Sequence, residues 1–261
     1  AARTALQKNL SEQITVLGAT LARFLFGLPI ILTGLAVIFF ISGQSFPAPT
    51  GPFVGYAWTG GVAQLLGNAL LLHLLNLSTF TVGTTYTKTE VIQTAGISYV
   101  VIDEPVEAGG LAGIIVAFAG VALMAMGRAN LSIVSMFKAL CHKPALYGLI
   151  VGALYAIAAV FFRAAALALP EGDFFLRALT TLAWVIAAQM IFLLIWLRWK
   201  TPGIITATAK AWPMGCWVGL TGVIASTCWY TAFTLQNVSY VMALGQIELV
   251  MTYMISRLIF K

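Results

Sequence analysis

The chain has 261 residues, of which 61% are hydrophobic and only 8% charged, and its mean hydropathy is +0.97. Soluble domains contain roughly 45–50% apolar residues, so this composition excludes a soluble globular protein. The formal net charge is +6, but the basic residues are scattered between apolar runs without interleaved aromatics, and we therefore expect no nucleic acid partner.

Apolar runs of membrane-spanning length follow one another along the chain. A helix that crosses a bilayer needs about 20 predominantly apolar residues. The sequence offers eight such runs, at 19–42, 53–75, 78–102, 109–127, 145–169, 174–197, 212–235 and 238–260. They are continuously apolar, unlike the alternating strands of a membrane barrel. The sequence predicts an all-α polytopic protein surrounded by membrane lipids, and we expect a bacterial inner (plasma) membrane.

The third and eighth runs resemble each other. The segment Lys88–Asp103, KTEVIQTAGISYVVID, aligns with Gln246–Lys261, QIELVMTYMISRLIFK, 158 residues later. Polar residues recur in both copies at i, i+4 and i+8, which places them on one helix face. The pairs are Glu90 with Glu248, Thr94 with Thr252, and Ser98 with Ser256. Because many transporters consist of two related halves, we interpret the chain as an internal duplication.

The two copies differ in extent. The first continues beyond Asp103 with another apolar run, whereas the second stops at Lys261. Arg163 follows a long apolar run, whereas its counterpart Arg3 follows only two residues. We therefore expect a piece of a ten-helix protein that lacks the first and last spans, built from two inverted five-helix repeats with eight spans present. The predicted parts are a first repeat over 1–127, a basic inter-repeat loop over 128–144, and a second repeat over 145–261.

Four stretches carry a resemblance to a known family. They read ARTALQKNLSEQITVLGATLARFLFGLP, VGTTYTKTEVIQ, IDEPVEAGGLAGIIVAFAGVALM and YVMALGQIELVMTYMISRL. In this order they are similar to segments of EamA-type members of the drug/metabolite transporter superfamily. The acidic hairpin with its proline and the ALGQIELV segment are the most specific parts. The resemblance implies a ten-helix bundle of two inverted repeats that moves a small organic solute by alternating access, and it implies no particular substrate.

The charged connections separate onto two predicted faces. The basic ones are loops expected at 1–18, 128–144 and 198–211. The acidic residues on the opposite face are Asp103, Glu104, Glu107, Glu171 and Asp173. The positive-inside rule places the basic face in the cytoplasm, so both termini of a ten-helix protein lie outside. The family resemblance implies termini inside. We favour the charge asymmetry because it belongs to this sequence.

Two glutamates lie near the middle of predicted spans. A charged side chain there costs several kcal/mol unless it faces a cavity or a partner. We therefore predict that Glu90 and Glu248 line a water-accessible cavity; the alternative is a carboxyl group that joins two helices. Lys88 lies about 200° from Glu90 around a continuous helix, so each needs a partner elsewhere. Arg23 and Arg163 are the predicted partners of the carboxylates.

The copies differ at one position of this face. The second copy has Gln246 where the first has Lys88, so we assign the shared chemistry to the glutamates and substrate discrimination to Lys88. Because desolvation penalises a charged carboxylate, the proton is the candidate coupling ion. Neutral polar residues complete the candidate ligands of substrate or coupling ion, with helix packing as the alternative: Tyr86, Gln93, Thr94, Thr252, Gln64 and Asn68.

The pattern as a whole predicts a secondary active transporter, an exporter of a small organic metabolite or drug-like solute, rather than an enzyme. The alternatives are a membrane-embedded enzyme acting on a lipid-like substrate, and a structural or channel subunit. An enzyme of that kind requires clustered Asp or His residues. We instead interpret the acids at 103, 104 and 107 as a solvated turn in which Glu107 opens the next helix. The three cysteines form no C-x-x-C motif, and we expect no metal and no cofactor.

Glycines one turn apart predict close helix approach in three places, because small residues let backbones come together. The pairs are Gly109 with Gly113, Gly148 with Gly152, and Gly215 with Gly219.

Overall fold

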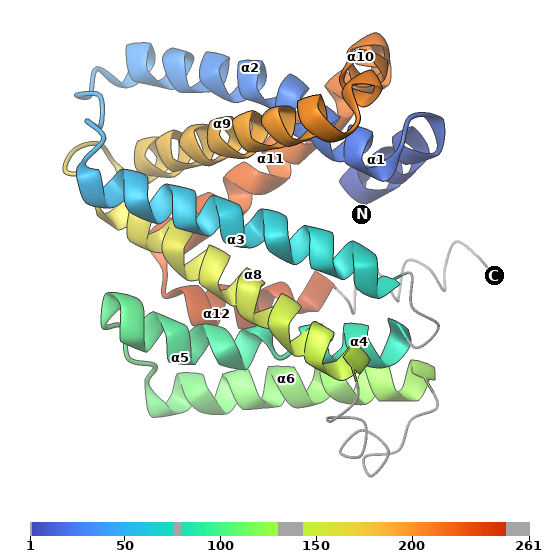
Figure 1. The fold of residues 1–261 in the computed structure, drawn as a ribbon. Helices are drawn as coiled ribbons and strands as arrows, with labels where there is room; N and C mark the ends of the chain where they lie inside the picture. The colour runs from blue at the N-terminus through green and yellow to red at the C-terminus, as the bar shows by residue number, and fades with distance from the viewer. Residues whose placement is uncertain (1, 76–79, 130–142, 249–261) are drawn as a thin grey trace. The chain divides into compact units, whose positions relative to one another are not determined.

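The computed structural model describes residues 2–75, 80–129 and 143–248, and every element in these ranges is an α-helix (Figure 1). The helices are α1 (Ala2–Gln13), α2 (Val16–Ser42), α3 (Gly51–Leu75), α4 (Phe80–Thr87), α5 (Glu90–Ile102), α6 (Ala108–Ala129), α8 (Lys143–Leu167), α9 (Phe174–Lys200), α10 (Pro202–Lys210), α11 (Trp212–Leu235) and α12 (Val238–Gly245). The all-α prediction is confirmed. Helices α2, α8, α9 and α11 are long and apolar enough to cross a membrane.

The helices form two compact units. The first unit consists of Ala1–Gly61 and Ala165–Leu235, and the second of Val62–Ala164 and Gln236–Lys261. Each unit takes segments from both halves of the sequence, so packing does not follow chain order. This division concerns contacts within the fold, and the boundaries of the two sequence repeats stay a prediction.

The first unit is organised around α2, which packs on α9 and α11. Helices α2 and α11 come close because glycines face each other: a Cβ on Gly219 would lie 2.8 Å from the backbone nitrogen of Gly27. The Phe26 ring occupies the space beside Gly215. The predicted close approach at Gly215 and Gly219 is confirmed, since any larger residue there meets the backbone or ring of α2.

The second unit brings α8 against the α4–α5 segment, and α5 against α6 and α12 (Figure 1). A Cβ on Gly148 would collide with the carbonyl oxygen of Gly83, and one on Gly152 would lie 3.0 Å from the carbonyl oxygen of Thr87. The prediction for Gly148 and Gly152 is therefore also confirmed.

The third glycine pair behaves differently. No atom of the described residues lies within 4 Å of a Cβ placed on Gly109 or Gly113, whereas Gly110 lies directly against the Tyr240 ring. The close approach expected from the pair is not found among the residues that the structure describes. Adjacent helical residues point about 100° apart, so the face of α6 that meets α12 carries Gly110 and leaves the other two glycines exposed.

Two connections expected to be loops contain helix. Residues 1–18 include α1, and residues 198–211 include the end of α9 and the whole of α10. Lys and Arg are favourable in a last helical turn because they complement the helix dipole, and α9 ends with Arg198 and Lys200. Pro202 then opens α10 at a position where a missing N–H costs nothing. The basic connection at 128–144 falls mostly outside the described residues.

Asp173 caps the start of α9. Its carboxylate accepts the backbone N–H of Leu176 at 2.8 Å and the side-chain amide of Gln44 at 3.0 Å. These hydrogen bonds, that of Leu176 first, hold the pKa of Asp173 below its ordinary value.

The capping bond predicts an acid-sensitive contribution to stability. Because the pKa is lower in the folded protein, the contribution is present above the unfolded pKa of about 3.9 and is lost as pH falls through the folded value. Asp173→Ala should lower the free energy of unfolding by about 1 kcal/mol at neutral pH, and Asp173→Asn, which keeps a capping oxygen, by less. Tryptophan-fluorescence melting in detergent from neutral to acid pH measures this. If Asp173→Ala loses as much stability in acid as the wild type does, the prediction is contradicted. Glu171→Ala, which changes an exposed glutamate of the same turn, is the control.

Candidate functional site

The predicted helix over 78–102 is interrupted in the middle. Lys88 and Thr89 separate α4 from α5, and their N–H groups bond to carbonyls three residues back at 3.2 and 3.1 Å, as in a tight turn. The turn brings Nζ of Lys88 to 3.9 Å from Oε1 of Glu90. The prediction that these two side chains cannot pair is therefore wrong, because the separation of 200° holds only in a continuous helix.

The second copy ends its helix at the corresponding place. Helix α12 ends at Gly245, 158 residues after α4 ends at Thr87. Gln246, which corresponds to Lys88, also forms a turn, with its N–H bonded to Ala243 O at 3.2 Å. The register that aligns the sequences thus aligns the ends of these two helices as well.

The two helix ends meet at Glu90. Nε2 of Gln246 donates to Oε1 of Glu90 at 3.3 Å and to the carbonyl oxygen of Met242 at 3.4 Å. Glu90 and Gln246 are both buried, whereas the side chain of Lys88 is 30% exposed. A buried carboxylate is tolerated where opposite charge and hydrogen bonds compensate for lost water, and Lys88 and Gln246 supply both.

A line of polar side chains leads away from this point between α5 and α12. On α5 it continues through Thr94 and Ser98, and on α12 it includes Ser239, all with no exposed surface. Thr94 donates to the carbonyl oxygen of Glu90 at 2.6 Å. The hydroxyls of Ser98 and Ser239 have no hydrogen-bond partner within the described part of the chain. We call this interface, from Glu90 and Gln246 to Ser98 and Ser239, the polar seam.

Two other predicted ligands join helices to α8. Gln93 donates to Oγ1 of Thr89 at 2.8 Å and to the carbonyl oxygen of Leu149 at 3.4 Å. Asn68 on α3 accepts the hydroxyl of Tyr155 at 2.8 Å, a partner that the sequence analysis did not identify. Contacts of this kind are common between membrane helices as packing interactions. Of the remaining candidates, Tyr86 is buried and Gln64 is half-buried.

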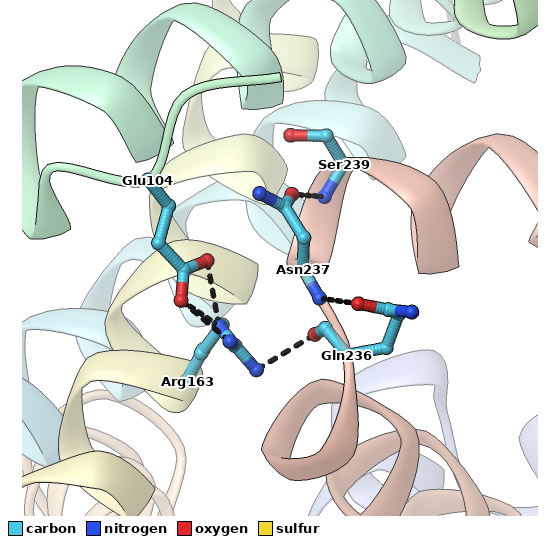
Figure 2. Close-up of polar contacts among 5 residues, drawn as sticks. All are labelled: Glu104, Arg163, Gln236, Asn237 and Ser239. Atoms are coloured by element: carbon cyan, nitrogen blue, oxygen red, sulfur yellow. Dashed lines mark hydrogen bonds and ion pairs between the residues drawn. The ribbon is translucent and has the colours of Figure 1, made fainter. Parts of the chain in front are cut away.

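Arg163 pairs with a different glutamate from the one predicted. Its Nε lies 2.8 Å from both carboxylate oxygens of Glu104, and its Nη1 donates to the carbonyl oxygen of Gln236 at 2.7 Å (Figure 2). Arg163 was predicted as a partner of the carboxylates of Glu90 and Glu248, and its position along α8 explains why it meets Glu104 and not Glu90. Gly152 is the α8 residue beside Glu90, and Arg163 lies eleven residues further on, about 16 Å at the helical rise.

The α5–α6 turn is therefore only partly solvated. Glu104 is half-buried against Arg163, which corrects the interpretation of all three acids as a solvated turn. Glu107 is exposed, and its carbonyl accepts the N–H of Leu111 at 2.8 Å, so it opens α6 as expected. The signal for Glu104 was present in the sequence, since an arginine in an apolar run needs an anion near the same end of its helix.

The structure also describes the predicted ligands Arg23 and Glu248. Arg23 on α2 donates from Nη2 to Oγ of Ser226 at 3.2 Å, and its guanidinium carbon lies 5.4 Å from the centre of the Phe24 ring. Glu248 follows α12 and is exposed. Thr252 lies outside the described residues. Roles for these three in transport stay predictions.

Comparison with known proteins finds a family that resembles the first part of the chain. The sequence model of the EamA-like transporter family matches residues 1–126, a range that includes Lys88 and Glu90. No curated protein and no solved structure matches the chain. The apolar helices and the family match together indicate an integral membrane protein. Over residues 1–126 the chain is similar to the EamA-like transporter family, in line with the resemblance of its motifs.

Proposed function

We propose that the protein is a secondary active transporter of the drug/metabolite transporter superfamily that exports a small organic metabolite or drug-like solute by alternating access. The observation that carries this proposal is the buried Glu90 where the ends of α4 and α12 meet. Non-helical backbone at membrane depth is tolerated only where protein covers it or where it lines a cavity. In secondary transporters, interrupted helices of this kind form the substrate and ion sites.

The inverted repeat receives support from the contacts of α12. Gln246 at its end lies beside the start of α5. Tyr240 near its start lies beside the α5–α6 turn, where its hydroxyl accepts the N–H of Glu107 at 3.1 Å. Helices α5 and α12 therefore run in opposite directions. Since α12 corresponds to α4, which leads into α5, this is the relation that two inverted copies would produce. We infer a pseudo-two-fold axis in the membrane plane, as in a ten-helix protein of two five-helix repeats.

The polar seam suggests a division of roles. Glu90 exchanges the coupling proton, because it is the buried carboxylate of the seam. Lys88, partly exposed at 3.9 Å from Glu90, binds an anionic group of the solute or adjusts the charge on Glu90. Gln246, its counterpart in the second copy, cannot carry charge, so only the first copy discriminates between solutes.

Flux assays test the transport function. Purified full-length protein in liposomes, with an imposed proton gradient, should move at least one member of a panel of labelled organic anions, cations and neutral metabolites, saturably and with counterflow. Flux that does not saturate, with ion currents, would favour the channel alternative. A panel that moves no faster than in protein-free liposomes would contradict the proposal.

We also propose that the basic connections face the cytoplasm of a bacterial inner membrane. Glu171 before α9 and Lys200 at its end are both exposed, and α9 is long enough to span. In intact cells, an impermeant thiol reagent should label a cysteine at Glu171 and leave one at Lys200 unlabelled until the membrane is opened. The reverse labelling would invert the orientation. Labelling of both from outside would show that α9 does not span.

A further inference from the structure

One end of the polar seam is closed by an ion pair. Arg163 joins the carboxylate of Glu104, in the α5–α6 turn, to the backbone carbonyl of Gln236, directly before α12 (Figure 2). We call these three residues the clamp. The chain beyond Gln236 is fixed in turn, because the Asn237 N–H bonds to the side chain of Gln236 and the Ser239 N–H to Oδ1 of Asn237, both at 2.9 Å.

A second contact holds the same turn against α12. The hydroxyl of Tyr240 accepts the N–H of Glu107 at 3.1 Å, and its ring lies against Gly110 at the start of α6. The α5–α6 turn is thus tied to the start of α12 on both sides of Pro105. An exposed connection of five residues would otherwise be free to move away.

The clamp lies at the end of the seam that carries the two serines. Helices α5 and α12 are antiparallel, with Gln246 beside Glu90 at the opposite end. Ser98 lies eight residues after Glu90, and Ser239 seven residues before Gln246, which is about 12 and 10 Å at the helical rise. Both serines therefore lie at one level, next to the clamp.

These serines carry unused hydrogen-bonding capacity. Both are fully buried, and neither hydroxyl has a partner among the described residues. A buried hydroxyl that finds no partner costs about 1–3 kcal/mol. Oε1 of Gln246, at the other end of the seam, also lacks a partner among the described residues, but two such hydroxyls at one level point to a bound polar group there. The charges of the seam lie at its other end, in Lys88 and Glu90, so the group that fits here is neutral.

We propose that the clamp is a gate, and that Ser98 and Ser239 behind it bind a neutral hydrogen-bonding group of the solute, such as a hydroxyl or an amide. This rests on the proposed function, in which the seam is the transport site. Arg163 and Glu104 have side chains that are 10% and 21% exposed, so the pair lies at the border of solvent, where its two charges can separate into water. Separation removes the stronger of the two contacts that hold the α5–α6 turn on α12, and the turn can then open, with loss of the Tyr240 contact, to expose the serines.

Thiol labelling tests the gate without any substrate. In full-length protein with every native cysteine replaced by serine, Ser239→Cys should react slowly with a small cationic methanethiosulfonate. Glu104→Gln should speed this reaction by about tenfold or more, because loss of one partner of a buried ion pair favours the open state. Exchange of the charges, Glu104→Arg with Arg163→Glu, should restore slow labelling. Glu107→Gln, an exposed glutamate of the same turn, should leave the rate unchanged.

Several results would overturn the gate. Labelling of Ser239→Cys at the same rate with and without Glu104→Gln would show that the clamp is a fixed structural pair, as would equal acceleration by Glu107→Gln. If Glu104→Gln does not fold, Arg163→Lys gives the same comparison, because it keeps the charge but not the paired geometry. Ser98→Cys serves as a second reporter of labelling. The labelling assay does not depend on flux. If Glu104→Gln leaves the labelling rate unchanged in a protein that transports solute, the gate is refuted and the transport function is not. Absence of flux in the liposome assay refutes the transport function alone.

Discussion

Replacement of Glu90 by glutamine is expected to abolish the pH dependence of flux while expression and melting temperature stay close to those of the wild type. Glutamine has the shape of glutamate and can still bond to Gln246, which lies 3.3 Å from Oε1, but it cannot exchange a proton. The ratio of the two forms of a titrating carboxyl changes about tenfold per pH unit, so its removal should be visible across a pH series.

The measurement is solute flux in liposomes over the neutral pH range, with exposed Glu107→Gln as the matched control. Lys88→Gln in the same assay should change the preference among solutes, since it makes the first copy resemble the second at Gln246. Normal flux of Glu90→Gln at every pH, together with a lower melting temperature, would show that the carboxyl only joins α5 to α12.

Gly148→Ala is expected to be among the most destabilising single-methyl changes in the chain. The added Cβ would collide with the carbonyl oxygen of Gly83 and lie 2.8 Å from Cβ of Tyr86. Because the nearest obstacle is backbone, α8 and α4 would have to move apart. Overpacking of this kind costs about 1–3 kcal/mol.

Gly113→Ala provides the control for this substitution. Gly113 is also helical, but a Cβ there meets no described atom within 4 Å. Alanine stabilises a helix interior by roughly 0.5–1 kcal/mol relative to glycine, so this variant should melt at or above the wild-type temperature. Tryptophan fluorescence in detergent compares the two. Equal melting temperatures for both variants would show that α8 does not approach α4 closely.

Much of the architecture follows from the sequence because it depends on local composition. Continuous apolar length determines which segments become membrane helices, and α2, α9 and α11 each contain the predicted apolar run. The sequence register of 158 residues aligns Lys88 with Gln246, and each of these residues directly follows the end of a helix, α4 or α12. Burial of the stripe through Glu90, Thr94 and Ser98 follows from the same reasoning, since polar groups in an apolar helix turn away from lipid.

Only the tertiary structure decided which side chains meet. Arg163 had several acids as possible partners, and its position along α8 selected Glu104. Gly110 rather than Gly109 or Gly113 contacts a neighbour, because the rotation of α6 about its axis depends on what packs against it. The turn at Lys88 and Thr89 lies inside an apolar run of spanning length, where composition favours continuous helix. Its formation depends on contacts with α8 and α12, which are distant in sequence and therefore absent from any local pattern.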